Sequence, residues 1–103
     1  YAFDRELMRR ARAGPDTDVV KDGDYNESRS CINAILSGRV GDCYIAYKRR
    51  RDRTGPDLIA SAIEDGFGKE IHNHYCAGRI NRKLGTGSIR MSRRSKTGDC
   101  DIV

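Results

Sequence analysis

Four cysteines constrain this chain more than any other feature. Cys31, Cys43, Cys76 and Cys100 are widely spaced within 103 residues, and no two of them form a close Cys-x-x-Cys pair. An even number of cysteines at such spacing favours two disulfides that close long loops, as in a small secreted domain. Since only 37% of the residues are hydrophobic, the core is modest, and each disulfide would add about 2–4 kcal/mol of stability. Reduced, buried thiols or a metal-binding set are the alternative.

A first helix and several extended segments are indicated by the residue pattern. The helix covers about ten residues, with Asn26 or Ser28 as its N-cap and an inward face that runs to Leu36. Residues 18–21 and 99–103 suit short strands, and residues 43–47 give the best strand of the chain. In the last long strand Ile89 and Met91 are expected to face inward and Arg90 and Ser92 outward.

A second, longer helix is predicted after residue 53. Thr54 and Asp57 have the spacing of a capping box, and Gly78 is a natural stop. Gly66 and Gly68 favour a kink within the helix. Its apolar residues recur every four positions: Ile59, Ile63, Phe67, Ile71 and Tyr75.

This order of elements predicts an α+β fold, in which a small antiparallel sheet is covered on one face by two helices, as in a split βαβ, ferredoxin-like sandwich. Antiparallel helices would then bring Cys31 beside Cys76, so we expect the pairs Cys31–Cys76 and Cys43–Cys100, with the other two connectivities open. Residues 1–15 are expected to be an N-terminal arm or a residual pro-segment, because Arg9-Arg10 is a dibasic processing sequence. Residues 16–103 form the single domain.

The net charge of +5 is unevenly distributed along the chain, with an acidic segment at 16–27 and basic segments at 48–53 and 79–96. This asymmetry favours a polyanionic partner such as nucleic acid, acidic lipid or a cell-wall polymer. Tyr44 and Tyr47, just before the first basic segment, could offer stacking surfaces for bases. The expected contact residues are Lys48, Arg49, Arg50, Arg51, Arg53, Arg79, Arg82, Lys83, Arg90, Arg93 and Arg94.

Only the cluster around His72 has the residue types of a catalytic site. Glu70, His72 and His74 could act as acid and base beside arginines that hold a phosphate, as in small basic ribonucleases. Both histidines come from one short segment, however, which does not suit two groups that flank one phosphate. Phosphate-binding loops and nucleophile motifs are absent, and we expect no catalysis, no cofactor and no metal.

Over residues 17–100 the chain resembles the small secreted killer toxins of fungi and their effector relatives, the KP6-like α/β-sandwich group more than the KP4-like group. The resemblance rests on the order of elements, on Gly41-Asp42-Cys43 at the start of a strand, and on the helix that ends in His74-Tyr75-Cys76. It implies a non-enzymatic, extracellular cytotoxin or effector, and it assigns no site residues. We therefore expect a secreted protein that binds a component of the target-cell wall or membrane through its basic face. The alternative is a secreted ribonuclease-like or nucleic-acid-binding protein.

Overall fold

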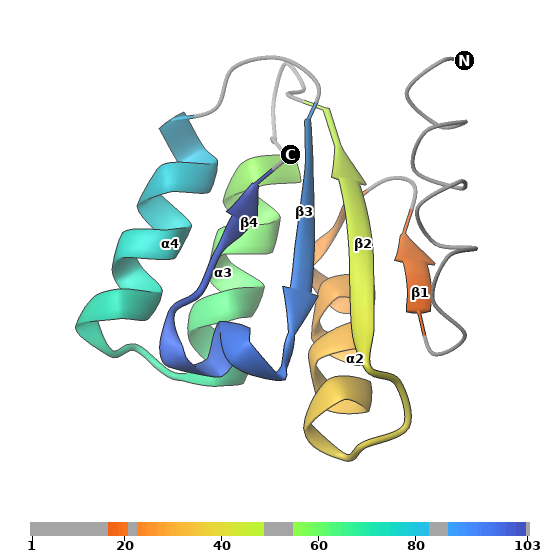
Figure 1. Ribbon diagram of the computed structural model, residues 1–103. Helices are drawn as coiled ribbons and strands as arrows, with labels where there is room; N and C mark the ends of the chain where they lie inside the picture. The colour runs from red at the N-terminus through yellow and green to blue at the C-terminus, as the bar shows by residue number, and fades with distance from the viewer. Residues whose placement is uncertain (1–16, 21–22, 49–54, 83–86, 103) are drawn as a thin grey trace.

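A computed structural model describes residues 17–20, 23–48, 55–82 and 87–102, and places one sheet against one layer of helices (Figure 1). The strands follow the order β1-β2-β3-β4, with β1 parallel to β2 and the other neighbours antiparallel. The strands are β1 (Thr17–Val20), β2 (Asp42–Tyr47), β3 (Gly87–Ser92) and β4 (Asp101–Ile102). The helices are α2 (Tyr25–Leu36), α3 (Gly55–Phe67) and α4 (Ile71–Arg82), with a short 3₁₀ helix η1 (Arg93–Thr97) before β4.

The α+β class and the sheet with helices on one face are confirmed. The described residues contain three α-helices rather than two, and α3 lies between α2 and α4 in the helical layer (Figure 1). The β1–α2–β2 unit is also not split, because β1 and β2 are direct neighbours in the sheet.

Helix α2 begins two to four residues earlier than its sequence pattern indicates. The Asp24 carboxylate accepts a hydrogen bond from the Glu27 amide at 2.7 Å, so Asp24 is the N-cap instead of Asn26 or Ser28. At the other end Leu36 is 39% exposed and does not join the core. The helix is linked to α3 by the Tyr25 hydroxyl, which donates to Asp65 Oδ2 at 2.6 Å. This hydrogen bond is the main reason that the pKa of Tyr25 is raised above 10.0.

The inner face of the sheet carries alternating apolar residues, as expected for a half-buried strand pair. Ile45 pairs with Ile89, and Cys43 pairs with Met91, and all four side chains are buried. Tyr47 pairs with Gly87, where a Cβ atom would lie 2.7 Å from the phenol oxygen of Tyr47. The ring therefore needs the space that only glycine leaves. The predicted inward positions of β3 are confirmed, and Arg90 is exposed.

The long second helix is in fact two helices, separated at Gly68. This residue has φ +111°, a backbone conformation that favours glycine and ends α3. The buried Asn73 side chain donates through Nδ2 to the Gly68 carbonyl at 3.0 Å and fixes the turn into α4. Helix α4 does not continue the buried face of α3 in the four-residue spacing of the sequence. Its buried residues are Asn73, Cys76, Ala77 and Ile80. As a result Ile71 and Tyr75, which were expected to be core residues, are 89% and 65% exposed.

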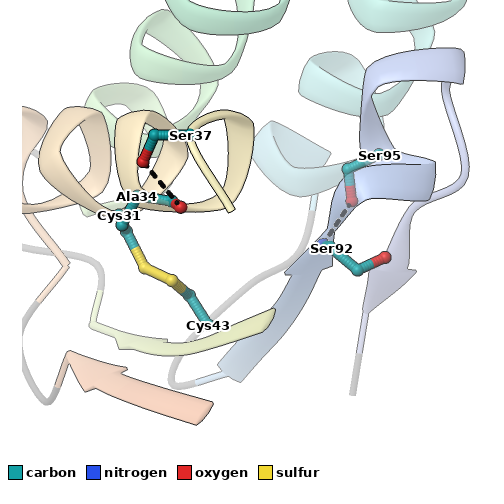
Figure 2. Close-up of a disulfide and its surroundings, with 6 residues drawn as sticks. All are labelled: Cys31, Ala34, Ser37, Cys43, Ser92 and Ser95. Atoms are coloured by element: carbon teal, nitrogen blue, oxygen red, sulfur yellow. Dashed lines mark hydrogen bonds between the residues drawn. A yellow bond between two sulfur atoms is a disulfide. The ribbon is translucent and has the colours of Figure 1, made fainter. Parts of the chain in front are cut away.

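All four cysteines are paired, but not in the expected way. The disulfides are Cys31–Cys43, which joins α2 to β2 (Figure 2), and Cys76–Cys100, which joins α4 to the segment before β4. The expected pairs Cys31–Cys76 and Cys43–Cys100 are wrong because α3 separates α2 from α4. Cys31–Cys43 instead fastens α2 to a strand of the sheet, and Cys76–Cys100 fastens α4 to the segment that leads into β4. At the far end of β3, Ser95 Oγ accepts from the Ser92 amide at 3.0 Å and closes the first turn of η1 (Figure 2).

No helix within the described ranges is long and apolar enough to span a membrane. The expected N-terminal arm, residues 1–15, lies outside the described residues, as does Thr54 of the expected capping box.

Candidate functional site

The expected basic face is divided between two ends of the molecule. Lys48 follows β2 at the end of the sheet where β3 begins, since Tyr47 pairs with Gly87. Arg79 and Arg82 lie in the last turn of α4, at this same end (Figure 1). Arg93 and Arg94 belong to η1, which follows the other end of β3 (Figure 1). We call the first of these groups, Lys48, Arg79 and Arg82, the basic end.

Some of the expected contact residues have no described position in the structure. Five of them lie outside the described residues: Arg49, Arg50, Arg51, Arg53 and Lys83. Their neighbours in the chain, Lys48 and Arg82, both belong to the basic end.

Some of the described arginines are in ion pairs with carboxylates, and others are not. On the outer face of the sheet Arg90 Nε lies 3.0 Å from Asp42 Oδ2, and in η1 Arg94 Nη2 lies 2.9 Å from Asp99 Oδ2. Arg79 and Arg82 are exposed, and within the described part of the chain neither has a carboxylate partner. These two guanidinium groups therefore keep their hydrogen-bond donors for an external anion.

Arg79 and Arg82 border a shallow pocket of about 340 Å³, which is completed by Tyr75 and Ile102. The Arg82 guanidinium bends back over Gly78, so that a Cβ at position 78 would lie 3.4 Å from Arg82 Nη1. Helix α4 contains no aspartate or glutamate. Two guanidinium groups beside a phenol and an aliphatic side chain can bind a phosphate, sulfate or carboxylate group of a partly apolar molecule.

A second shallow pocket, of about 550 Å³, runs along α2 and is lined by residues that include Asn26, Glu27, Asn33 and Arg39. Its lining combines an acid and a base with neutral amides. It therefore has no charge preference that would select the expected polyanion.

The residues of the expected catalytic cluster do not converge. His72 Nε2 lies 3.0 Å from Glu70 Oε2, whereas His74 Nδ1 lies 3.2 Å from Glu64 Oε1 of α3. Positions two apart on a helix are rotated by about 200°, so the two imidazoles point away from each other. Gly98, with φ +95°, packs against the His72 ring. No group of three metal-binding side chains occurs among the described residues.

The aromatic residue best placed for recognition was assigned to the core by the sequence pattern. Tyr47 is buried against Gly87 and cannot stack on a ligand, and Tyr44 is only partly exposed. Tyr75 is the exposed ring beside the free arginines. The exposure of Tyr75 could have been predicted from the sequence if Gly68 had been interpreted as the end of a helix instead of a kink.

No known protein family, curated protein or solved structure matches this chain. The function of the chain is therefore inferred from the geometry of α4 and its surroundings.

Proposed function

We propose that this protein is a secreted, non-enzymatic cytotoxin or effector that binds an anionic component of the target-cell surface through its basic end. The observation that carries the proposal is the pair Arg79 and Arg82, both exposed and without carboxylate partners in the described structure. Arg90 and Arg94, by contrast, form surface ion pairs with Asp42 and Asp99.

The disulfides support the extracellular part of the proposal. Two crosslinks that include every cysteine suit an oxidising environment, where a small domain depends on them for stability. They also hold the elements on which the site is built, because Cys76 lies in α4 between Tyr75 and the two arginines in sequence. The arginines are thus presented by a helix that is fixed to the rest of the domain.

Charge reversal at the basic end tests the proposal. The double variant Arg79→Glu/Arg82→Glu should bind intact fungal cells, the targets that the killer-toxin resemblance implies, at least about tenfold more weakly than the wild type. The matched control is Arg93→Glu/Lys96→Glu, which makes the same change in net charge at the η1 end. Equal losses in both variants would show that net charge acts without a site, and full binding by the first variant would refute the basic end.

Nucleic-acid binding is the second candidate function, favoured by the exposed Tyr75 ring beside Arg79. Aromatic stacking combined with arginine contacts is the usual means of holding single strands. Affinity for a single-stranded oligonucleotide would then fall with salt, and loss of Arg79 and Arg82 would reduce the log–log slope by about 1.4. An unchanged slope in Arg79→Glu/Arg82→Glu would exclude this function for the basic end.

A further inference from the structure

The outer face of α4 combines two kinds of side chain that rarely share an exposed surface. Ile71, Tyr75, Gly78 and Arg82 are spaced by four, three and four residues, so they lie in one line along the helix. The buried residues of α4 occupy the opposite side. This line begins with a nearly fully exposed isoleucine and ends with a free arginine, and Arg79 lies beside it.

The apolar half of this face is unusual for its degree of exposure. Within the described part of the chain, Ile71, Tyr75 and Leu36 are the large hydrophobic residues that are exposed, and two of the three lie on this one line. Ile71 has no polar function that water or a sugar could satisfy. Its exposure is a consequence of the helix break at Gly68, because the break gives α4 a rotation in which Asn73 instead of Ile71 faces the core.

The cationic half contains no competing acid. The carboxylates nearest to it in sequence are accounted for: Glu70 lies beside His72, and Asp99 beside Arg94. Asp101 is adjacent to Ile102 of the pocket but points to the other face of the sheet, since successive strand residues alternate. Anionic groups can therefore approach Arg79 and Arg82 without repulsion from their immediate neighbours.

From this arrangement we infer that the outer face of α4 docks on an anionic phospholipid bilayer. Ile71 and Tyr75 enter the headgroup layer, and Arg79 and Arg82 hold lipid phosphates. The inference rests on the proposed function and names its partner. Charge complementarity selects an anionic surface, and the exposed isoleucine selects lipid over nucleic acid, because bases stack on aromatic rings and guanidinium planes but gain little from an aliphatic side chain.

Vesicle co-sedimentation tests the inference directly. The wild type should bind vesicles of phosphatidylcholine with phosphatidylserine, and bind vesicles of phosphatidylcholine alone much more weakly. Ile71→Ser/Tyr75→Ser should lower the affinity for the anionic vesicles at least about tenfold, since each side chain loses its burial in the interface. Arg79→Glu/Arg82→Glu should lower it about 20-fold or more. The matched controls Leu36→Ser and Arg93→Glu/Lys96→Glu should bind like the wild type.

A fluorescent probe gives a second readout that does not depend on affinity. The chain has no tryptophan, so Ile71→Trp introduces a single indole on α4 and Leu36→Trp a single indole on α2. Addition of anionic vesicles should shift the emission of the first variant to the blue and leave that of the second unchanged. Since both positions are exposed, both variants should keep the thermal unfolding midpoint of the wild type.

The outcomes separate the inference from the proposed function. If Arg79→Glu/Arg82→Glu loses binding to target cells while Ile71→Ser/Tyr75→Ser keeps all binding to cells and vesicles, the basic end stands and the lipid inference is overturned. The inference is also overturned if the wild type prefers RNA to anionic vesicles. A dimer in lipid-free sedimentation that Ile71→Ser/Tyr75→Ser converts to a monomer would overturn it as well, in favour of a second copy of the chain as the occupant.

Discussion

Replacing Gly68 by alanine tests the helix break that gives α4 its exposed face. The residue has φ +111°, and an alanine held there would cost about 1–3 kcal/mol of backbone strain. No steric term adds to this, because the nearest atom to the new Cβ, Asn73 Nδ2, is 4.0 Å away. In a domain of this size the loss corresponds to a decrease of about 5–15 °C in the thermal midpoint.

The sign of the change in unfolding free energy decides between two separate helices and one kinked, continuous helix. In a continuous helix Gly68→Ala would stabilise the protein by about 0.5–1 kcal/mol, the usual gain from removing a helical glycine. Gly78→Ala provides that reference, since Gly78 lies within α4 and its nearest contact, Arg82 Nη1, is at 3.4 Å. Urea unfolding followed by far-ultraviolet circular dichroism should show opposite signs for the two variants. Stabilisation by both would refute the break, and with it the explanation for the exposure of Ile71.

Three further outcomes are expected. Ser28→Ala should leave the free energy of unfolding unchanged or raise it by up to about 1 kcal/mol, because the buried Ser28 hydroxyl has no hydrogen-bond partner in the described structure; a clear loss in urea unfolding would contradict this. Cys76→Ala/Cys100→Ala should lower the unfolding free energy by about 3.5 kcal/mol, the loop-closure value for a separation of 24 residues, and a loss below about 1 kcal/mol would refute that crosslink. Ultraviolet titration should show a later ionisation of Tyr25, whose pKa is raised mainly by its hydrogen bond to Asp65, and Asp65→Asn should reduce the delay. Because this pKa is higher in the folded state, the contribution of Tyr25 to stability is present below pH 10.0 and lost as the pH rises through the raised value.

Local patterns predicted the strands and the first helix because each of these elements is determined by nearby residues. The alternation of Cys43, Ile45 and Tyr47 identifies a strand with one buried face, and the structure confirms it. The prediction of one long second helix is wrong for a reason that the same pattern cannot reveal. Ile71 continues the four-residue spacing of Ile63 and Phe67 across Gly68, although the backbone changes direction there.

The disulfide pairing and the candidate site depended on the order of helices in space. Pairing Cys31 with Cys76 assumed that their two helices are neighbours, but α3 intervenes. The division of the basic residues into two ends also follows from topology, because β3 carries Arg93 away from Arg82. Charge counted along the chain could indicate a polyanionic partner, but only the folded structure shows that Arg90 and Arg94 are paired with Asp42 and Asp99.

The Cys76–Cys100 bond holds α4 in place by a covalent link, which would set it apart from most helices that bind a bilayer surface. Peptides that bind bilayers commonly gain their helical structure on arrival, and the cost of ordering limits their affinity. Here the helix is already formed, and a covalent anchor on its inner side joins it to the chain just before β4. On a bilayer the domain would dock as a rigid body, and it would insert no deeper than the side chains of Ile71 and Tyr75 reach. A reductant that cleaves the Cys76–Cys100 bond would change how firmly α4 is held against the domain.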